Sequence, residues 1–413
     1  MSLANGRHYL AIPGPSVMPD RVLQAMHQPA PNIYSGDLVD MTHGIIPDLK
    51  AVAGTEQFAA IYIANGHGAW EAALSNVLRR GDKVLVLATG RFCVGWGEMA
   101  TRLGAEVETL DFGQRAPVDV VRVAEHLKAD TDHAIKAVLV VQVDTSTSVK
   151  NDIPALRGAM DDADHPALLM VDCIACLGCD EFHMDAWGVD VMVTGSQKGL
   201  MTPPGLGLVF FNEKADAARD RADVVSGYWD WRPRSRPEEY YQFFGGTAPT
   251  HHLFGLREAL NMIVHEEGLP SFWARHEALA RAIWAAFGVW GQDGPIELNI
   301  ADPAYRSNAV TSLRIGAPHG TALRDWVTEN AGVTLGIGLG MAAPGDPAWH
   351  GFFRIGHMGH VNAQMVMGAL SSIDAGLKAL DIPHGSGALE AATPVIAEAV
   401  RASATPLRTA VTA

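Results

Sequence analysis

The sequence predicts an α/β fold: a mostly parallel, seven-stranded-type sheet forms a large domain, and a smaller α+β domain follows. The first observation is that short apolar runs alternate with stretches of helical spacing from about residue 57. The second is that these runs are almost continuously apolar, which is typical of strands covered by helices on both faces. The third is that the alternation stops after Pro249, where a long helical region begins.

The elements of the large domain follow from these patterns. The predicted strands are Ile61–Ala64, Lys83–Ala88, Val107–Leu110, Ala137–Val143, Ala167–Val171, Val189–Thr194 and Leu206–Phe211. The predicted helices between them are Ala69–Leu78, Phe92–Leu103, Val118–Leu127 and Ile153–Asp161. In a sheet of this kind ligands bind beyond the carboxyl ends of the strands, so the chemistry is expected there.

The smaller domain is expected to be joined by one long helix from His251 to about Phe287. Its predicted strands are Val310–Arg314, Val333–Leu335 and Phe352–Gly356, and its predicted helices are Gly320–Asn330 and Asn362–Leu380. We therefore divide the chain into an N-terminal segment (1–20), a large domain (21–262), a small domain (263–385) and a tail (386–413). The tail is expected to form one helix and then fray.

Composition excludes several classes of function. The 413 residues are 48% hydrophobic and carry a formal net charge of −15, which disfavours a nucleic-acid partner. Four cysteines in a chain of this length do not make a disulfide framework. No apolar stretch reaches the membrane-spanning length of about 18–20 residues, and no signal peptide is visible. We expect a cytoplasmic protein without a membrane partner.

Two reactive side chains follow neighbouring predicted strands. Asp172 comes directly after Ala167–Val171, and Lys198 lies in the small-residue segment after Val189–Thr194. Alone, Asp172 reads as a helix cap or salt-bridge partner, and Lys198 as a surface lysine. Together they suit pyridoxal phosphate (PLP), which needs a lysine for a Schiff base and a carboxylate that keeps its ring nitrogen protonated. The two strands place both residues at one crevice.

Two further segments suit anions. In Asn65-Gly66-His67-Gly68 a strand leads through glycines into a helix, and the amides there suit a phosphate, although many such turns bind nothing. Arg354 lies inside an apolar strand, and a buried arginine needs an anionic partner. That partner is either an internal carboxylate or the carboxylate of a substrate, held in a bidentate clamp.

With these elements the sequence resembles the class V aminotransferases, most closely the serine–, alanine– and aspartate–glyoxylate group. The resemblance runs from Pro13 to about residue 385 and rests on GHGAWEAAL, VDTSTSVK, VD, TGSQKG and RIGHMG in this order. It implies a fold-type-I PLP enzyme, usually a homodimer with shared active sites. The implied reaction moves an amino group from serine, alanine or aspartate to a 2-oxo acid such as glyoxylate or pyruvate.

The resemblance also implies roles for individual residues. Lys198 would be the Schiff-base lysine and proton shuttle, Asp172 the partner of the ring nitrogen, Phe92 the stacking aromatic and Thr145 the contact to the ring oxygen. The phosphate and ring contacts would be Gly66, His67, Gly68, Ser196 and Gln197, with Thr247 supplied by the partner chain. The substrate side would be lined by Arg354 as carboxylate clamp, Gly14, Pro15 and Tyr34.

Some residues depart from the glyoxylate enzymes, and the donor therefore stays open. The usual His-x-Glu segment reads Gln142-Val143-Asp144, and Phe244 lies where an aromatic hydroxyl is expected. Tyr34, Asp144-Thr145 and the RIGHMG motif are also similar to pyridoxamine–pyruvate aminotransferases. Those enzymes lack a phosphate seat, whereas Asn65–Gly68 matches one, which favours an amino-acid donor.

The cysteines raise two alternatives. Cys173, Cys176 and Cys179 have a C-x2-C-x2-C spacing, but a metal site needs a fourth ligand, and Cys93 lies beside Phe92. We expect buried thiols and no metal. A cysteine desulfurase or another lyase is the second alternative. A desulfurase needs a mobile cysteine in the small domain, and all four cysteines precede residue 180.

Overall fold

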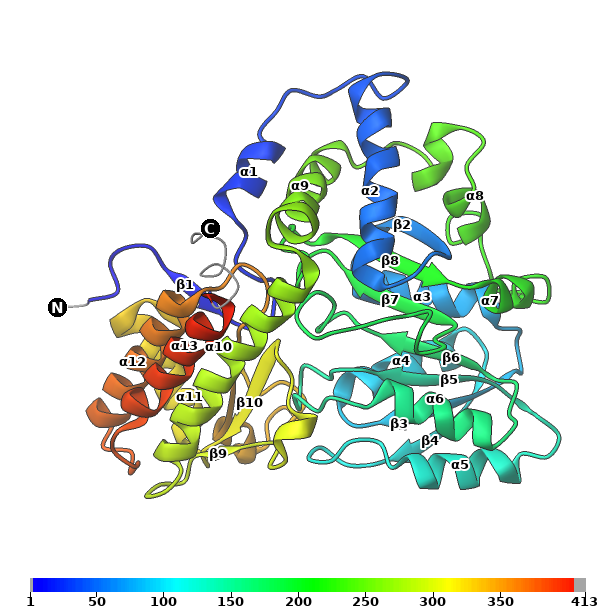
Figure 1. Cartoon of the computed structure of the whole chain (residues 1–413). Coiled ribbons are helices and arrows are strands. Elements are labelled where there is room, and N and C mark those ends of the chain that lie inside the picture. Colours follow the sequence, from blue (N-terminus) through cyan, green and yellow to red (C-terminus); the bar gives the residue numbers. More distant parts are fainter. Residues whose placement is uncertain (1–2, 405–413) are drawn as a thin grey trace, which may run out of the picture.

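The computed structural model describes residues 3–404 (Figure 1). Its large sheet has seven strands in the order β2-β8-β7-β6-β5-β3-β4. Strands β3 to β7 pair in parallel, and only β8 runs antiparallel to its neighbours. The mostly parallel sheet predicted from the sequence is confirmed. The strands are β2 (Phe58–Ala64), β3 (Lys83–Ala88), β4 (Glu106–Asp111), β5 (Ile135–Val141), β6 (Leu168–Asp172), β7 (Val191–Gly195) and β8 (Gly205–Phe211).

Helices cover both faces of this sheet because successive strand residues point to opposite sides. Val84 and Val86 of β3 pack in one apolar cluster with α3 (Gly66–Val77) and α4 (Arg91–Arg102). Leu85 and Leu87 pack in a second cluster on the other side. The helices of that second face include α2 (Asp37–Ala53), α5 (Val120–Ala129), α6 (Ile153–Asp162) and α9 (Thr250–Leu260).

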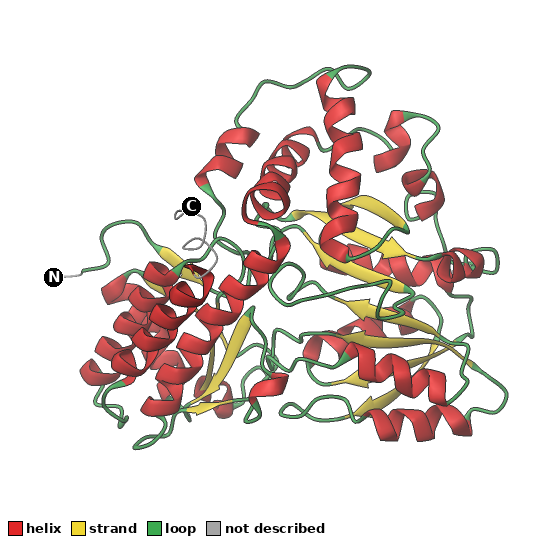
Figure 2. Cartoon of the chain, in the orientation of Figure 1, coloured by secondary structure: helices red, strands yellow, loops and turns green. Residues whose placement is uncertain are grey.

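A second sheet of five strands lies beside the first (Figures 1 and 2). Its order is β1-β11-β12-β10-β9, and β1 pairs in parallel with β11, so the start of the chain joins the C-terminal sheet. The sequence patterns missed β1, since three residues at an edge are too short to show a period. The strands are β1 (Tyr9–Ala11), β9 (Glu297–Leu298), β10 (Val310–Arg314), β11 (Val333–Ile337) and β12 (Phe352–Gly356).

Four helices pack on this sheet around a core of its own, α10 (Leu269–Trp290), α11 (His319–Ala331), α12 (Ala363–Ala379) and α13 (Ala388–Ala404). The predicted single helix from His251 to Phe287 is wrong. Helix α9 is followed by a π-helical stretch, Asn261–Glu267, and Gly268 separates it from α10. Gly268 has a φ of 79°, a conformation that ends a helix, and Pro270 then starts a new one.

The domain boundaries drawn from the sequence stay a prediction, and the fraying expected after α13 lies outside the described residues. Within residues 3–404 no helix is both long and apolar enough to cross a membrane. The remaining short helices are α1 (Asp20–Met26), α7 (Glu213–Ala218), α8 (Trp231–Ser235) and the 3-10 turns Tyr240–Phe244, Pro303–Tyr305 and Pro347–Gly351.

Candidate active site

A cavity of about 260 Å³ lies at the carboxyl edge of the large sheet. Strands β6 and β7 pair with Asp172 opposite Val193, so Asp172 and the segment that carries Lys198 leave the sheet side by side. The sequence argument for one shared crevice is confirmed. Of the predicted site residues, the cavity is lined by Gly66, His67, Phe92, Thr145, Asp172, Gln197 and Lys198.

Lys198 is held by the N-terminal segment. Its ammonium donates a hydrogen bond to the carbonyl of Pro13, and Ser16 Oγ donates to the Lys198 carbonyl at 2.8 Å. Gly14 has a φ of 87°, which L side chains rarely adopt, and a Cβ there would lie 2.5 Å from Lys198 Nζ, so any larger residue would strain the backbone and displace the lysine. Burial, together with the nearby Arg354 guanidinium, lowers the pKa of Lys198 to about 8. A lysine in this setting is a usable base near neutral pH, not a surface charge.

Asp172 is buried and accepts two hydrogen bonds from neutral donors. Trp70 Nε1 donates to Oδ2 at 2.7 Å, and the Ile174 amide donates to Oδ1 at 2.6 Å. Burial raises the pKa of this carboxyl to about 7. Its environment therefore favours a cationic partner, which a protonated ring nitrogen supplies. The sequence patterns did not predict Trp70 as a site residue. The only sequence signal for it is that a tryptophan occurs in the helix that follows the glycine turn.

The cavity also has polar groups suited to a phosphate, but two backbone amides of the expected glycine turn already have a hydrogen-bond partner. Asn65 Oδ1 accepts hydrogen bonds from the amides of His67 and Gly68, at 3.1 and 3.3 Å. By contrast, Oε1 of Gln197 is buried without a hydrogen-bond partner. An amide can be turned to present either atom, so Gln197 offers an unsatisfied group to a ligand. Lys198, Asp172 and Gln197 together fit PLP.

The comparison with known proteins decides the family. The family model described as "Aminotransferase class-V" matches residues 8–362. This chain is a class V aminotransferase. It is 37% identical over 403 residues to the serine–glyoxylate aminotransferase of Methylorubrum extorquens, covering 94% of this chain and 96% of the relative. It is 34% identical to the L-aspartate–glyoxylate aminotransferase of Paracoccus denitrificans, covering 91% and 93%.

The solved structures agree on the fold. The pyridoxamine–pyruvate aminotransferase of Mesorhizobium loti superposes with a TM-score of 0.86 at 24% identity, covering 96% of this chain and all of the other. At this identity the likeness concerns the fold alone. Class V aminotransferases depend on PLP, so the cofactor predicted from Lys198 and Asp172 is confirmed for this aminotransferase.

Arg354 of the aminotransferase is buried on β12. Its Nε donates to the carbonyl of Ile337 and one terminal nitrogen donates to the carbonyl of Thr145, both at 2.7 Å. Within residues 3–404 no carboxylate forms an ion pair with it. Burial lowers the pKa of Arg354 to about 10, although the nearby Asp144 charge opposes this. Two carbonyls thus orient the guanidinium and leave other N–H groups for an anion.

Several predicted residues do not line this cavity. The Ser196 hydroxyl donates to the carbonyl of Pro203 at 2.7 Å, and Gly68 packs against Ala64 and Trp229. Pro15, Tyr34 and Thr247 are exposed, Tyr34 with 87% of its surface accessible. Their roles stay predictions. Gly14 contacts Lys198 without lining the cavity.

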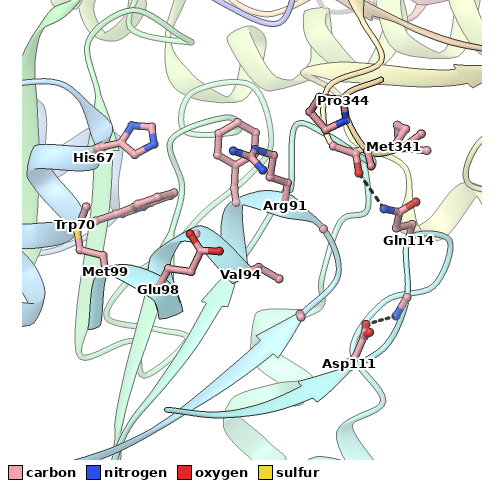
Figure 3. Close-up of a pocket in the computed structure, with 18 of the residues that line it drawn as sticks. His67, Trp70, Arg91, Val94, Glu98, Met99, Asp111, Gln114, Met341 and Pro344 are labelled. Carbon is pink, nitrogen blue, oxygen red and sulfur yellow. Dashed lines mark hydrogen bonds between the residues drawn. The ribbon is translucent and has the colours of Figure 1, made fainter. Parts of the chain in front are cut away.

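A second pocket, of about 740 Å³, adjoins the cavity and shares His67, Trp70 and Phe92 with it (Figure 3). Its far wall belongs to the loop after β11. The Gly340 carbonyl of this loop accepts a hydrogen bond of 2.9 Å from Gln114 Nε2, which lies after β4. Segments from both sheets therefore form the outer part of the site.

All four cysteines are buried. The thiols of Cys173 and Cys176 donate to Oε1 of Gln142, at 3.4 and 3.0 Å. Within the described part of the chain, no group of three or more His, Cys, Asp or Glu side chains has an arrangement that could hold a metal ion.

Proposed function

We propose that this aminotransferase transfers the amino group of a small L-amino acid, serine, alanine or aspartate, to a 2-oxo acid such as glyoxylate or pyruvate. The observation that carries the proposal is the meeting of Lys198 and the buried Asp172 at one cavity. The relatives named serine–glyoxylate and L-aspartate–glyoxylate aminotransferase support glyoxylate as the acceptor.

When bound, PLP supplies an electron sink that acidifies the α-carbon of an attached amino acid. Lys198 Nζ then removes the proton from the α-carbon of the donor. In the second half of the cycle the 2-oxo acid would lose its carbonyl oxygen as water and gain the amino group that the donor left on the cofactor, while Nζ would deliver the proton to its α-carbon. A pKa of about 8 suits both directions, because the amine is neutral often enough to accept a proton and acidic enough to return it.

We assign Asp172 to the ring nitrogen of the cofactor and Arg354 to the α-carboxylate of the substrate. The hydrogen bonds to Asp172 come from two neutral donors, the Trp70 indole and the Ile174 amide, so a protonated ring nitrogen would give the carboxylate a charged hydrogen-bond partner. Arg354 already uses two N–H groups on the carbonyls of Ile337 and Thr145, which hold the guanidinium in one orientation. A preset orientation lowers the entropy lost when a carboxylate binds.

We assign the remaining cofactor contacts to the residues that line the cavity. The ring of Phe92 would stack on the cofactor, Thr145 would contact the ring oxygen, and Gln197 and Gly66–Gly68 would lie at the phosphate end. Thr247 and Tyr34 are exposed, which supports a homodimer in which each chain completes the other's site. Four unpaired cysteines suit a reducing compartment, and on composition we propose the cytoplasm.

One observation favours a second candidate, a pyridoxamine–pyruvate type of aminotransferase. Two amides of the predicted phosphate seat, those of His67 and Gly68, already donate to Asn65. A donor without a phosphate would not need them. A desulfurase is disfavoured, because all four cysteines are buried and precede residue 180.

The test is the visible spectrum of the purified protein during separate additions of L-serine, L-alanine, L-aspartate and pyridoxamine. A cofactor band bleached by one amino acid and restored by glyoxylate or pyruvate names donor and acceptor. Release of pyridoxal from pyridoxamine with pyruvate, with no response to amino acids, would establish the second candidate. A protein that binds no added PLP would contradict the first candidate, and one that also binds neither pyridoxal nor pyridoxamine would contradict both.

A further inference from the structure

Helix α4 carries Phe92 on its first turn but has no cap of its own. The N-cap residue is Gly90, which has no side chain to accept a hydrogen bond. The first amides of a helix lack partners inside the helix, and unsatisfied amides in a buried place are costly. Serine or asparagine is the usual solution, yet here a Cβ on residue 90 would lie 2.4 Å from the Asp144 carboxyl carbon.

The missing partners come from the loop after β5, more than fifty residues away. Asp144 Oδ2 accepts hydrogen bonds from the amides of Phe92 and Cys93, at 2.8 and 3.4 Å. The Arg91 amide donates to Ser146 Oγ at 3.1 Å, and that hydroxyl in turn donates to Asp144 Oδ1. The first three amides of α4 are therefore satisfied by two side chains of another segment.

The negative charge of Asp144 suits the start of α4, in addition to the hydrogen bonds that its carboxylate accepts. The carboxylate is completely buried, and it lies at the positive end of the α4 dipole. The Ser146 amide donates to Oδ1 at 2.9 Å, so both oxygens are occupied by donors. An asparagine in this place would turn an NH₂ group toward amides or toward Ser146, and it would remove the charge from the helix end.

We propose that Asp144 is a positioning residue, which caps α4 together with Ser146 and thereby fixes Phe92 against the cofactor. The inference rests on the proposed stacking role of Phe92. Phe92 lies at the start of α4, directly after β3, and Asp144 lies in the loop after β5. These two strands pair in parallel, so both residues lie at the carboxyl edge of the sheet.

The test compares Asp144→Asn with Asp190→Asn. Asp190 is also buried and accepts a backbone amide, that of Leu169, at 2.8 Å, but it lies before β7, at the far end of that strand from Lys198. Hydrogen exchange of the cofactor-free proteins is measured first. We expect residues 91–96 to exchange about tenfold faster in Asp144→Asn, the size of a lost helix cap, and at the wild-type rate in Asp190→Asn.

Titration with PLP and the visible circular dichroism of the bound cofactor form the second measurement. We expect Asp144→Asn to bind PLP about tenfold more weakly, with an altered dichroic band, and Asp190→Asn to resemble the wild type. The double variant Asp144→Asn/Phe92→Leu tests whether Asp144 acts through Phe92. If it does, the effects of the two substitutions on PLP affinity should not be additive.

Three results would overturn the inference: unchanged exchange at residues 91–96, an unchanged dichroic band, or effects that add fully to those of Phe92→Leu. If the wild type binds PLP and Asp144→Asn binds it equally well, only this inference fails. If the wild type binds no PLP, the proposed function fails first and the inference falls with it.

Discussion

The indole of Trp70 donates a hydrogen bond of 2.7 Å to the carboxylate of Asp172, across a sequence separation of 102 residues. Trp70 also stacks on Trp96, with ring centroids 6.0 Å apart, but Nε1 of Trp96 is buried without a partner. Two neighbouring tryptophans thus differ in one hydrogen bond, which makes Trp96 a matched control for Trp70.

We expect Trp70→Phe to lower the free energy of unfolding by about 1–3 kcal/mol more than Trp96→Phe, because only the first leaves a buried carboxylate short of a donor. It should also reduce kcat, since Asp172 would be less firmly oriented. Chemical denaturation and steady-state kinetics of both variants check this. Equal losses in the two variants would mean that the Trp70–Asp172 hydrogen bond contributes nothing measurable.

Asp172 should make the cofactor-free protein less stable as the pH rises. Its pKa is about 7 in the folded chain and near 3.8 when unfolded, so the folded state binds more protons between these values. Stability relative to Asp172→Asn should therefore fall between about pH 4 and pH 7, by up to a few kcal/mol, and then level off. Urea denaturation of both cofactor-free proteins across this range measures the difference. A difference that does not vary with pH would contradict the raised pKa.

Replacement of Lys198 should abolish turnover while the fold is retained. We expect Lys198→Met to lose at least roughly a thousandfold in kcat, because Lys198 is the only amine among the side chains that line the cavity. The cofactor should also be lost more readily on dialysis. Circular dichroism in the far ultraviolet serves as the control for folding. A well-folded Lys198→Met that still turns over would show that the lysine is wrongly assigned.

Arg354→Lys keeps the charge but loses the planar fork. We expect the KM for the amino donor to rise roughly 10- to 100-fold, the effect of losing about 1.5–3 kcal/mol of charged hydrogen bonding, with a smaller change in kcat. Arg314→Lys on the adjacent strand β10 is the control, since among the carboxylates of residues 3–404 Arg314 pairs only with that of Glu297, at 3.9 Å. If both variants raise KM alike, Arg354 is not the carboxylate clamp.

Much of the fold was accessible from sequence patterns because they depend on local chemistry. Strands buried on both faces must be apolar throughout, and parallel strands share a carboxyl edge, so Asp172 and Lys198 could be placed together. The same patterns failed between His251 and Phe287, where apolar spacing continues through the π-helical stretch and only Gly268 and Pro270 mark the new helix.

The sequence by itself determined the sheet, its carboxyl edge and the lysine–aspartate pair, since strand pattern and motif order carry that information. Only the tertiary structure decided that Trp70 supports Asp172, that Asp144 caps α4 and that Thr145 orients Arg354. These pairs are separated by 102, 52 and 209 residues. Hydrogen bonds across such separations leave no local period or spacing in the chain, because they form where packing brings distant loops to the same edge.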